Sequence, residues 1–274
     1  MPDPEATPAG IRGPMSRLYD VFIDWPGRLA REMPGIEKHL RAAGARRVLD
    51  AGCGTGRHVQ ALLERGFDAH GADASEDMLE EARALIGSPE RFHLWRMGAE
   101  PPPSLPAAGP FEAVIAMGNV WPQLAGEVDA RRTLEAFVHL LRPGGLVLLG
   151  LKAFAVRQAS GNPYLPLLRR VQEERPLWFI RFVDFAVARL DDGTPVCDLH
   201  MLVAAGDAES GPERTEALLH RATRMRVWSP AELEGWLADE GLTEVHVSAR
   251  LDDPLVPPQG EDVFASGRAP LRTP

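Results

Sequence analysis

Three glycines at alternate positions, Gly52, Gly54 and Gly56, follow an acidic residue, Asp50, in the segment VLDAGCGTG. Glycine lets a backbone approach a ligand closely, because it has no Cβ. The dinucleotide fingerprint is spaced GxGxxG and directs a helix N-terminus at a pyrophosphate, whereas the spacing here is GxGxG, and no Gly-Lys-Ser/Thr phosphate loop is present. A carboxylate beside the turn repels phosphate. The turn is therefore predicted to bind a ligand that carries an ammonium group.

A second acid, Asp73, stands about 20 residues after Gly52, at the end of the next predicted strand. In doubly wound sheets, an acid at this distance accepts hydrogen bonds from ribose hydroxyls. Asp73 thus indicates a nucleoside ligand, without by itself distinguishing one nucleoside cofactor from another.

Alternating strands and helices must position these residues. Helical spacing of apolar residues covers 15–43, where Pro26 and Pro34 are expected to divide the segment into two or three helices. Residues 100–110, with five prolines, are expected to be a loop. Strands are predicted at 46–50, 67–72, 91–96, 111–117 and 146–151, separated by helices at 58–65, 75–85 and 128–141. Such alternation implies a parallel sheet with right-handed crossovers.

The pattern changes after Lys152. Strands are predicted at 178–190, 196–205 and 216–228, then a helix at 229–239 and strands at 243–250 and 262–268, the last two antiparallel. The predicted fold class is α/β: a doubly wound, mostly parallel seven-stranded Rossmann-like sheet with an inserted antiparallel β subdomain. The predicted division is a disordered tail at 1–14, a ligand-binding domain at 15–151 and 229–268, and an inserted cap at 152–228.

Four segments in this order, VLDAGCGTG, GADASEDML, FEAVIAMGNVWPQL and LRPGGLVLL, resemble the class I methyltransferases that depend on S-adenosylmethionine (SAM). The resemblance covers residues 15–151 and 229–268, and is nearest in type to small-molecule members such as glycine/sarcosine N-methyltransferases. It implies that SAM binds at the turn, with S-adenosylhomocysteine as product and a small molecule as methyl acceptor. SAM carries an ammonium and no phosphate, as the glycine turn requires.

The resemblance also implies which residues hold SAM. In the glycine/sarcosine type, an arginine of the helix before the first strand binds the SAM carboxylate, and Arg28 occupies that place. Many relatives bind the adenine amino group through an acid after the third strand, where this chain has Gly98; Glu100 is an alternative by a short shift. The implied cofactor site comprises Tyr19, Arg28, Asp50, Gly52, Cys53, Gly54, Gly56, Asp73, Ala74, Met78, Gly98, Ala99, Met117 and Asn119.

The acceptor site is less determined. Trp121, Tyr164, Trp178, His200 and Arg224 are the candidate lining residues, although aromatic side chains are more often core. His200 is a candidate general base or an ordinary paired histidine, and Asn119 orients the acceptor or only shapes a turn. No residue is assigned as catalytic, because the sulfonium of SAM is already electrophilic and positioning supplies much of the rate.

The composition of the chain limits which partners, cellular compartment and metals are expected. A net charge of −9 argues against nucleic-acid and anionic-membrane partners, and the absence of a signal-like N-terminus or a long apolar run makes the cytoplasm the expected compartment. The two cysteines fit no metal-ligand spacing, so no metal is expected. A homodimer remains open. Two alternatives also remain: a SAM-binding sensor without activity, and an RNA or protein methyltransferase using the basic patch Arg221, Arg224 and Arg226.

Overall fold

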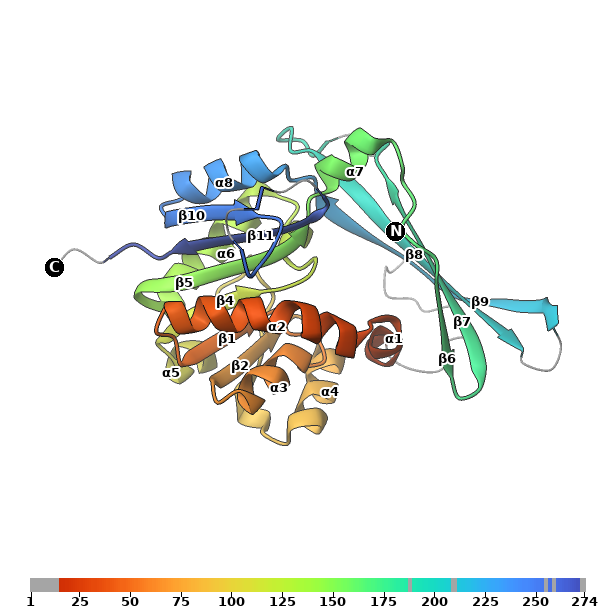
Figure 1. Ribbon diagram of the computed structural model, residues 1–274, viewed down its shortest axis with the longest axis horizontal. Helices are drawn as coiled ribbons and strands as arrows, with labels where there is room; N and C mark the ends of the chain where they lie inside the picture. The colour runs from red at the N-terminus through yellow and green to blue at the C-terminus, as the bar shows by residue number, and fades with distance from the viewer. Residues whose placement is uncertain (1–14, 187–188, 208–210, 254–255, 258–259, 272–274) are drawn as a thin grey trace.

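The protein contains two separate sheets in the computed structural model, which describes residues 15–186, 189–207, 211–253, 256–257 and 260–271. The predicted tail at 1–14 lies outside the described residues. A seven-stranded sheet has the order β10-β11-β5-β4-β1-β2-β3, and a four-stranded sheet has the order β6-β7-β8-β9 (Figure 1). The predicted fold class, a mostly parallel seven-stranded sheet with an antiparallel insert, is confirmed.

Five strands of the large sheet are parallel: β1 Arg47–Ala51, β2 Asp68–Asp73, β3 Phe92–Leu94, β4 Phe111–Ala116 and β5 Leu141–Lys152. The closing pair is β10 Thr243–Ser248 and β11 Asp262–Arg268, with β11 antiparallel to both β5 and β10. Strand order reverses between β1 and β4, which are neighbours although β2 and β3 separate them in sequence. Ligands of doubly wound sheets bind outside the carboxyl ends of the strands at this reversal.

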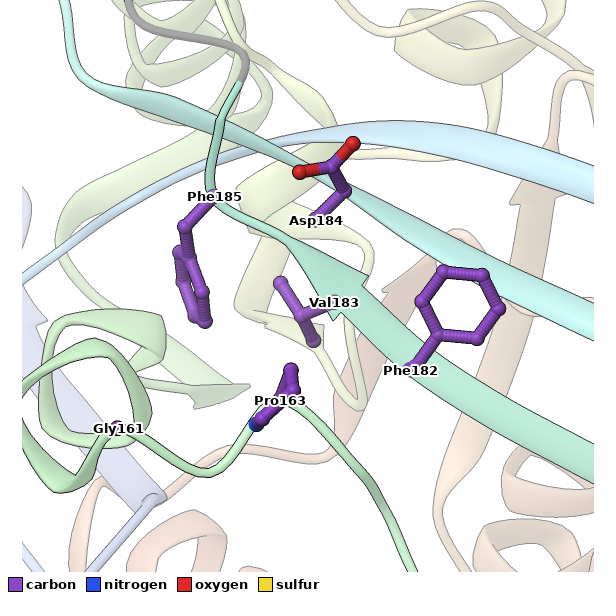
Figure 2. A pocket seen from close by; sticks show the side chains of 6 residues that line it. All are labelled: Gly161, Pro163, Phe182, Val183, Asp184 and Phe185. Atoms are coloured by element: carbon purple, nitrogen blue, oxygen red, sulfur yellow. The ribbon is translucent and has the colours of Figure 1, made fainter.

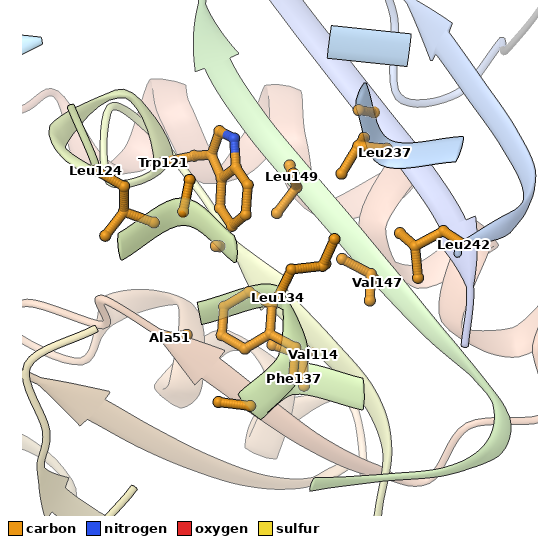
Figure 3. Close-up of a cluster of buried hydrophobic side chains, with 14 of the residues drawn as sticks. Ala51, Val114, Trp121, Leu124, Leu134, Phe137, Val147, Leu149, Leu237 and Leu242 are labelled. Atoms are coloured by element: carbon orange, nitrogen blue, oxygen red, sulfur yellow. The ribbon is translucent and has the colours of Figure 1, made fainter. Parts of the chain in front are cut away.

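Helices cover both faces of the large sheet. They are α2 Trp25–Ala42, α3 Arg57–Glu64 and α4 Glu76–Ile86 on one face, with α6 Glu127–Leu140 and α8 Pro230–Asp239 on the other. Figure 3 shows the hydrophobic core on the face covered by α6 and α8, where Phe137 of α6 and Leu237 of α8 pack with Val114 and Leu149 of the sheet. None of the described helices has the length and apolar composition needed to cross a membrane.

Local signals in the sequence explain where helices begin. The Ser75 side chain accepts a hydrogen bond from Met78 N and starts α4, and Ser229 with Glu232 forms a capping box at α8. Pro26 lies in the first turn of α2, where its missing N–H has no intrahelical partner.

The segment 15–43 forms two helices, within the two or three predicted, but Pro34 does not break the second one, and the predicted loop at 100–110 contains a short helix. Pro34 stays inside α2, because Met33 and Ile36 are fully buried and this packing outweighs one lost backbone hydrogen bond. Residues 100–110 include a short helix, α5 Ser104–Ala108, because Pro103 caps it and Pro106 falls in its first turn, where proline is tolerated.

The segment between β5 and α8 forms α7 Phe154–Ser160 and the small sheet. Its strands are β6 Leu168–Gln172, β7 Arg175–Asp184, β8 Val196–Asp207 and β9 Gly211–Arg226, all antiparallel. The sequence predicted three strands, and the structure has four. The missed strand, β6, is a five-residue edge strand (LRRVQ) that carries two adjacent arginines, so its apolar alternation is weak. The strand predicted at 178–190 ends earlier, at Asp184.

One face of the small sheet packs against helix α1 Met15–Phe22. Leu177, Phe179 and Val203 form a cluster with Leu18 of α1, and successive strand residues point to opposite faces. We call the face that carries Phe179 the inner face and the opposite one the outer face. Helix α1 thus lies between the two sheets (Figure 1).

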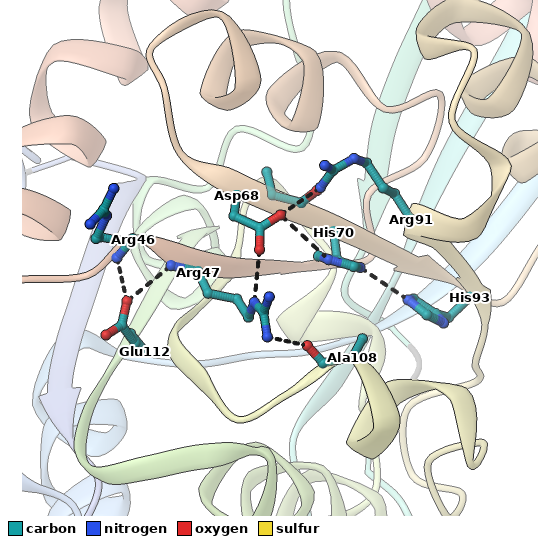
Figure 4. Close-up of polar contacts among 9 residues, drawn as sticks. Arg46, Arg47, Asp68, His70, Arg91, His93, Ala108 and Glu112 are labelled. Carbon is teal, nitrogen blue, oxygen red and sulfur yellow. Dashed lines mark hydrogen bonds and ion pairs between the residues drawn. The ribbon is translucent and has the colours of Figure 1, made fainter.

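A polar network links β1, β2 and β3, the three strands at one end of the large sheet (Figure 4). Asp68 pairs with Arg47 and Arg91, while His70 Nδ1 lies 3.4 Å from His93 Nε2. His93 also contacts the Ser104 hydroxyl at 2.9 Å. Burial, together with the charge of His70, lowers the pKa of His93 to about 4.

His93 is therefore expected to make the protein less stable in acid. Its folded pKa lies below the ordinary value of 6.5, so the unfolded chain takes up the proton first. The stabilisation present above pH 6.5 is lost as the pH falls toward 4, by about 2 kcal/mol at pH 4.5. Urea unfolding of the native protein and of His93→Gln between pH 4.5 and 7.5 measures the contribution of His93 to the free energy of unfolding. If this free energy changed with pH equally in the two proteins, the prediction would be contradicted.

Candidate cofactor-binding site

The glycine turn lies at the carboxyl end of β1, beside the reversal of strand order. Gly52 N and Cys53 N donate hydrogen bonds to Ala72 O at 2.7 and 3.0 Å, which ties the turn to the end of β2. Gly54 has φ +53°, and a Cβ built there would meet only Tyr19 Cε1, at 3.7 Å. The Tyr19 ring is therefore in van der Waals range of the position that a side chain at 54 would occupy.

Asp50 supplies a buried carboxylate at the base of the turn. The residue is 1 % exposed, and its Oδ2 has no hydrogen-bond partner among the described residues. Burial raises the pKa of Asp50 to about 6, although the nearby charges of His58 and Arg28 favour the ionised form. An orphaned carboxylate oxygen at this position is suited to a ligand ammonium.

Asp73 braces the turn from the end of β2. Its Oδ2 accepts a hydrogen bond from Gly54 N and its Oδ1 accepts one from Ser75 N, each at 2.9 Å. Burial raises the pKa of Asp73, and these two backbone bonds oppose the rise. The carboxylate is thus held at the strand end; Ala74 follows it before the N-cap Ser75, and Met78 lies in the first turn of α4.

Arg28 reaches the same edge of the sheet from α2. Its Nε donates to both Glu32 oxygens, at 3.0 and 3.1 Å, and Glu32 Oε2 contacts His58 Nε2 at 2.9 Å. Although burial works against ionisation, His58 and Arg28 hold the pKa of Glu32 below its ordinary range. A Cβ on Gly118, just after β4, would lie 3.0 Å from Arg28 Nη2. The outer edge of the guanidinium therefore points toward the carboxyl end of β4.

Two residues that the sequence analysis missed hold this arrangement together. Glu32 orients Arg28, and an Arg-to-Glu spacing of four on one helix was the available signal. Asp20 of α1 accepts hydrogen bonds from Thr55 Oγ1, at 2.6 Å, and from Arg57 Nη2, at 2.6 Å, both in or beside the glycine turn. No sequence pattern marks Asp20, because its partners are distant along the chain.

The remaining predicted cofactor residues lie around this crevice in different ways. Ala99 O accepts a hydrogen bond from Trp95 Nε1 at 3.0 Å, so the loop after β3 turns back on itself beside Gly98. Met117 is buried, and its Cε would meet a Cβ on Gly150, so it supports the crevice from below. Asn119 Oδ1 accepts from Lys152 N at 3.1 Å and joins the ends of β4 and β5.

The predicted acceptor residues do not gather around the crevice. Trp121 is fully buried with Phe137 and Trp236 in the core, so it lines no open space. Three of them, Trp178, His200 and Arg224, lie on the outer face of the small sheet. The strand register places their side chains on the face of the sheet that does not carry Phe179.

Outer-face contacts explain why these residues are there. His200 stacks on Phe182 with ring centroids 4.6 Å apart and contacts His220 at 2.9 Å, and Arg224 pairs with Asp198. Tyr164 is 66 % exposed beside the same sheet. His200 therefore does not face the crevice of its own chain as a general base would.

One hollow of the described surface lies away from the glycine turn. Figure 2 shows Pro163 and Val183 facing each other across it, with Phe182 and Phe185 to either side. The hollow measures about 370 Å³, and Asp184 supplies its one acidic side chain. A second hollow of about 340 Å³ lies at the corner between α1 and α2, lined by Asp20, Ile23, Trp25, Pro26, Leu29, Arg57 and Gln60. Only the second adjoins the glycine turn.

Comparison with known proteins agrees with this geometry. Residues 48–145 match the methyltransferase-domain family. The glycine/sarcosine N-methyltransferase of Halorhodospira halochloris is 38 % identical over 138 residues, covering 48 % of this chain and 49 % of the relative. That of Parasynechococcus marenigrum is 36 % identical over 156 residues, covering 53 % and 55 %. The chain thus spans about half the length of the curated relatives it matches.

Solved structures share the fold over nearly the whole chain. Streptomyces venezuelae DesVI has a TM-score of 0.72 and 21 % identity, covering 95 % of this chain and 100 % of its own. The sugar N-methyltransferase KedS8 of Streptoalloteichus has a TM-score of 0.69 and 17 % identity, with 98 % of each chain covered. The fold, the glycine turn and the family match together define a Rossmann-like methyltransferase domain. Residues 48–145 are similar to the matching region of methyltransferases that use SAM as cofactor.

The affinity for SAM is expected to rise with pH through the titration of Asp50. Its pKa near 6 means that it is mostly protonated at pH 5, and the ammonium of SAM favours the ionised form. We expect the association constant to increase about tenfold between pH 5 and 7.

Calorimetric titration with SAM at pH 5, 6 and 7 measures the effect. Asp50→Asn is the matched control, since it keeps the size of the side chain and cannot ionise. An equal pH dependence in the variant would show that Asp50 is not the responsible group.

Proposed function

We propose that the protein transfers a methyl group from SAM to a nitrogen or oxygen nucleophile of a small molecule by in-line displacement. One observation carries the proposal: the orphaned carboxylate of Asp50 and the guanidinium of Arg28 lie at the same strand ends. The amino-acid end of SAM has an ammonium and a carboxylate, which these two groups match in charge.

The chain's own residues bind and orient the reactants. Arg28, fixed by Glu32, holds the carboxylate of SAM, Asp50 holds its ammonium, and Asp73 accepts hydrogen bonds from the ribose hydroxyls while it braces Gly54. Bound SAM supplies an electrophilic methyl group. Helix α1 covers the crevice with Tyr19, whose pKa is raised by burial, so that its phenol remains a neutral hydrogen-bonding group.

An amine is the acceptor that these residues suit best. A neutral amine attacks without a general base, whereas a weakly acidic hydroxyl requires one. His200, the candidate base, lies on the outer face of the small sheet. The relatives named as glycine/sarcosine N-methyltransferases and the sugar N-methyltransferase neighbour support the same choice.

The alternative of an RNA methyltransferase has little support. Within the basic patch considered from the sequence, Arg224 pairs with Asp198 and Arg226 is buried against Glu127. Paired and buried arginines contribute little to phosphate binding. A SAM-binding sensor is separated from an enzyme by a methyl-transfer screen with labelled SAM, because a sensor would transfer label to no small amine.

Substitution of Asp73 tests the cofactor site. Asp73→Ala removes hydrogen bonds to a charged group, and we expect SAM binding to weaken by about 1.5–3 kcal/mol. Calorimetry with SAM, and with NAD as a second ligand, measures this. Glu76→Ala is the control: it removes an exposed acid three residues away that pairs with Arg83. Undiminished SAM affinity in Asp73→Ala, or binding of NAD alone, would refute the proposed site.

A further inference from the structure

Arg181 of β7 is a cation on the inner face of the small sheet. It follows the alternation of Leu177 and Phe179, which pack against α1, and its guanidinium stacks on Phe22 of α1 with Cζ 4.9 Å from the ring centroid. The residue therefore faces the methyltransferase domain rather than the solvent on the outer face.

Arg181 has no counter-ion in the part of the chain that the structure describes. The one hydrogen bond of the Arg181 side chain to the described residues runs from Nη2 to Pro166 O at 3.4 Å. The Nε of the same side chain is buried without a hydrogen-bond partner among those residues. The charged groups that act on it are Arg157 and Arg170, both cations, and with burial they lower the pKa of Arg181. Arg157, by contrast, pairs with Glu261 at 2.6 Å.

A purely structural role does not account for this residue. A partly buried charge without a counter-ion carries a desolvation cost, and the contact of its guanidinium with the Phe22 ring offsets only part of that cost. A cation retained in such a place is suited to a ligand that brings the missing negative charge, and guanidinium groups bind carboxylate and phosphate through parallel hydrogen bonds.

The position of Arg181 connects it to the cofactor crevice. Tyr19 and Phe22 are one turn apart on α1, with ring centroids 6.5 Å apart. Tyr19 Cε1 lies 3.7 Å from the position of a Cβ on Gly54, and Phe22 contacts Arg181. One helical turn thus separates the residue beside the glycine turn from the unpaired guanidinium.

We propose that Arg181 binds an anionic group of the methyl acceptor, a carboxylate or a phosphate, and so selects anionic amines over neutral ones. The inference rests on the proposed function and narrows its substrate class. The acceptor would lie along α1, with its amine toward the methyl group at the glycine turn and its anion on Arg181.

Anion-dependent stability is the first test. Thermal unfolding is followed for protein saturated with S-adenosylhomocysteine, in phosphate, in acetate and in chloride of matched ionic strength. At a tenfold excess over the dissociation constant, a bound anion raises the midpoint of the native protein by about 2–4 °C. The response is lost in Arg181→Met and kept in Arg224→Gln, a control that removes a paired arginine from the outer face of the same sheet.

The two anions distinguish the two sources of negative charge, because a carboxylate acceptor predicts a response to acetate and a phosphorylated acceptor a response to phosphate. In chloride alone, Arg181→Met should unfold no earlier than the native protein, whereas the loss of an arginine with a structural role would lower the unfolding midpoint. No response to either anion in the native protein, or the same response in Arg181→Met, would overturn the proposal.

Methyl transfer is the second test, with acceptors offered in pairs that differ in the anion alone: sarcosine with its amide, and glucosamine 6-phosphate with glucosamine. The anionic member of a productive pair should have the higher kcat/KM, by about 10- to 100-fold, and Arg181→Met should abolish the preference. A productive pair with no preference would contradict the inference. SAM affinity, measured on the same proteins, reports separately on the proposed function and should not change in Arg181→Met.

Discussion

The burial of Asp50 is the constraint on which the site depends. A carboxylate that is 1 % exposed, with one oxygen unpaired, loses solvation that no neighbour restores. The surrounding charges are arranged to limit this cost: Arg28 and His58 lie close enough to favour its ionised form, and Glu32 fixes both of them through direct hydrogen bonds. The four groups form one electrostatic unit beneath the glycine turn, and a cationic ligand would complete it. The geometry explains why the turn is followed by a helix that begins with Arg57 and His58 rather than with apolar residues.

Two aspartates fix the turn between the layers of the fold. Asp73 holds Gly54 from the sheet side, and Asp20 holds Thr55 and Arg57 from α1. Since α1 also packs against the inner face of the small sheet, a single eight-residue helix connects the cofactor crevice to the cap. A change in the position of α1 would therefore alter the contacts at the glycine turn and at Phe22 together.

Much of the fold and part of the site could be predicted from the sequence, because the signals were local. The glycine spacing, Asp50, Asp73 and the Ser75 cap each depend on residues close in the chain, and the β10–β11 pairing followed from two short apolar runs. Asp20 could not be identified in this way, since its hydrogen bonds to Thr55 and Arg57 are made across the fold, whereas for Glu32 the spacing of four from Arg28 was a local signal. For the small sheet, the face that α1 covers could not be predicted, because it depends on packing between segments more than 150 residues apart.

Many relatives carry an acidic residue after the third strand, where this chain has Gly98. Packing explains the glycine at this position. Gly98 has φ +89°, and a Cβ there would lie 3.0 Å from Cβ and Cγ of Asp129 and 3.1 Å from its Oδ1. A larger residue at 98 would be strained in its backbone and would displace the first turn of α6. The space that an acidic side chain at position 98 would enter is taken by the carboxyl group of Asp129, delivered by a different element. The chain thus retains a negative charge beside the loop after β3, and the departure from the family pattern at one position reflects the approach of α6 to that loop.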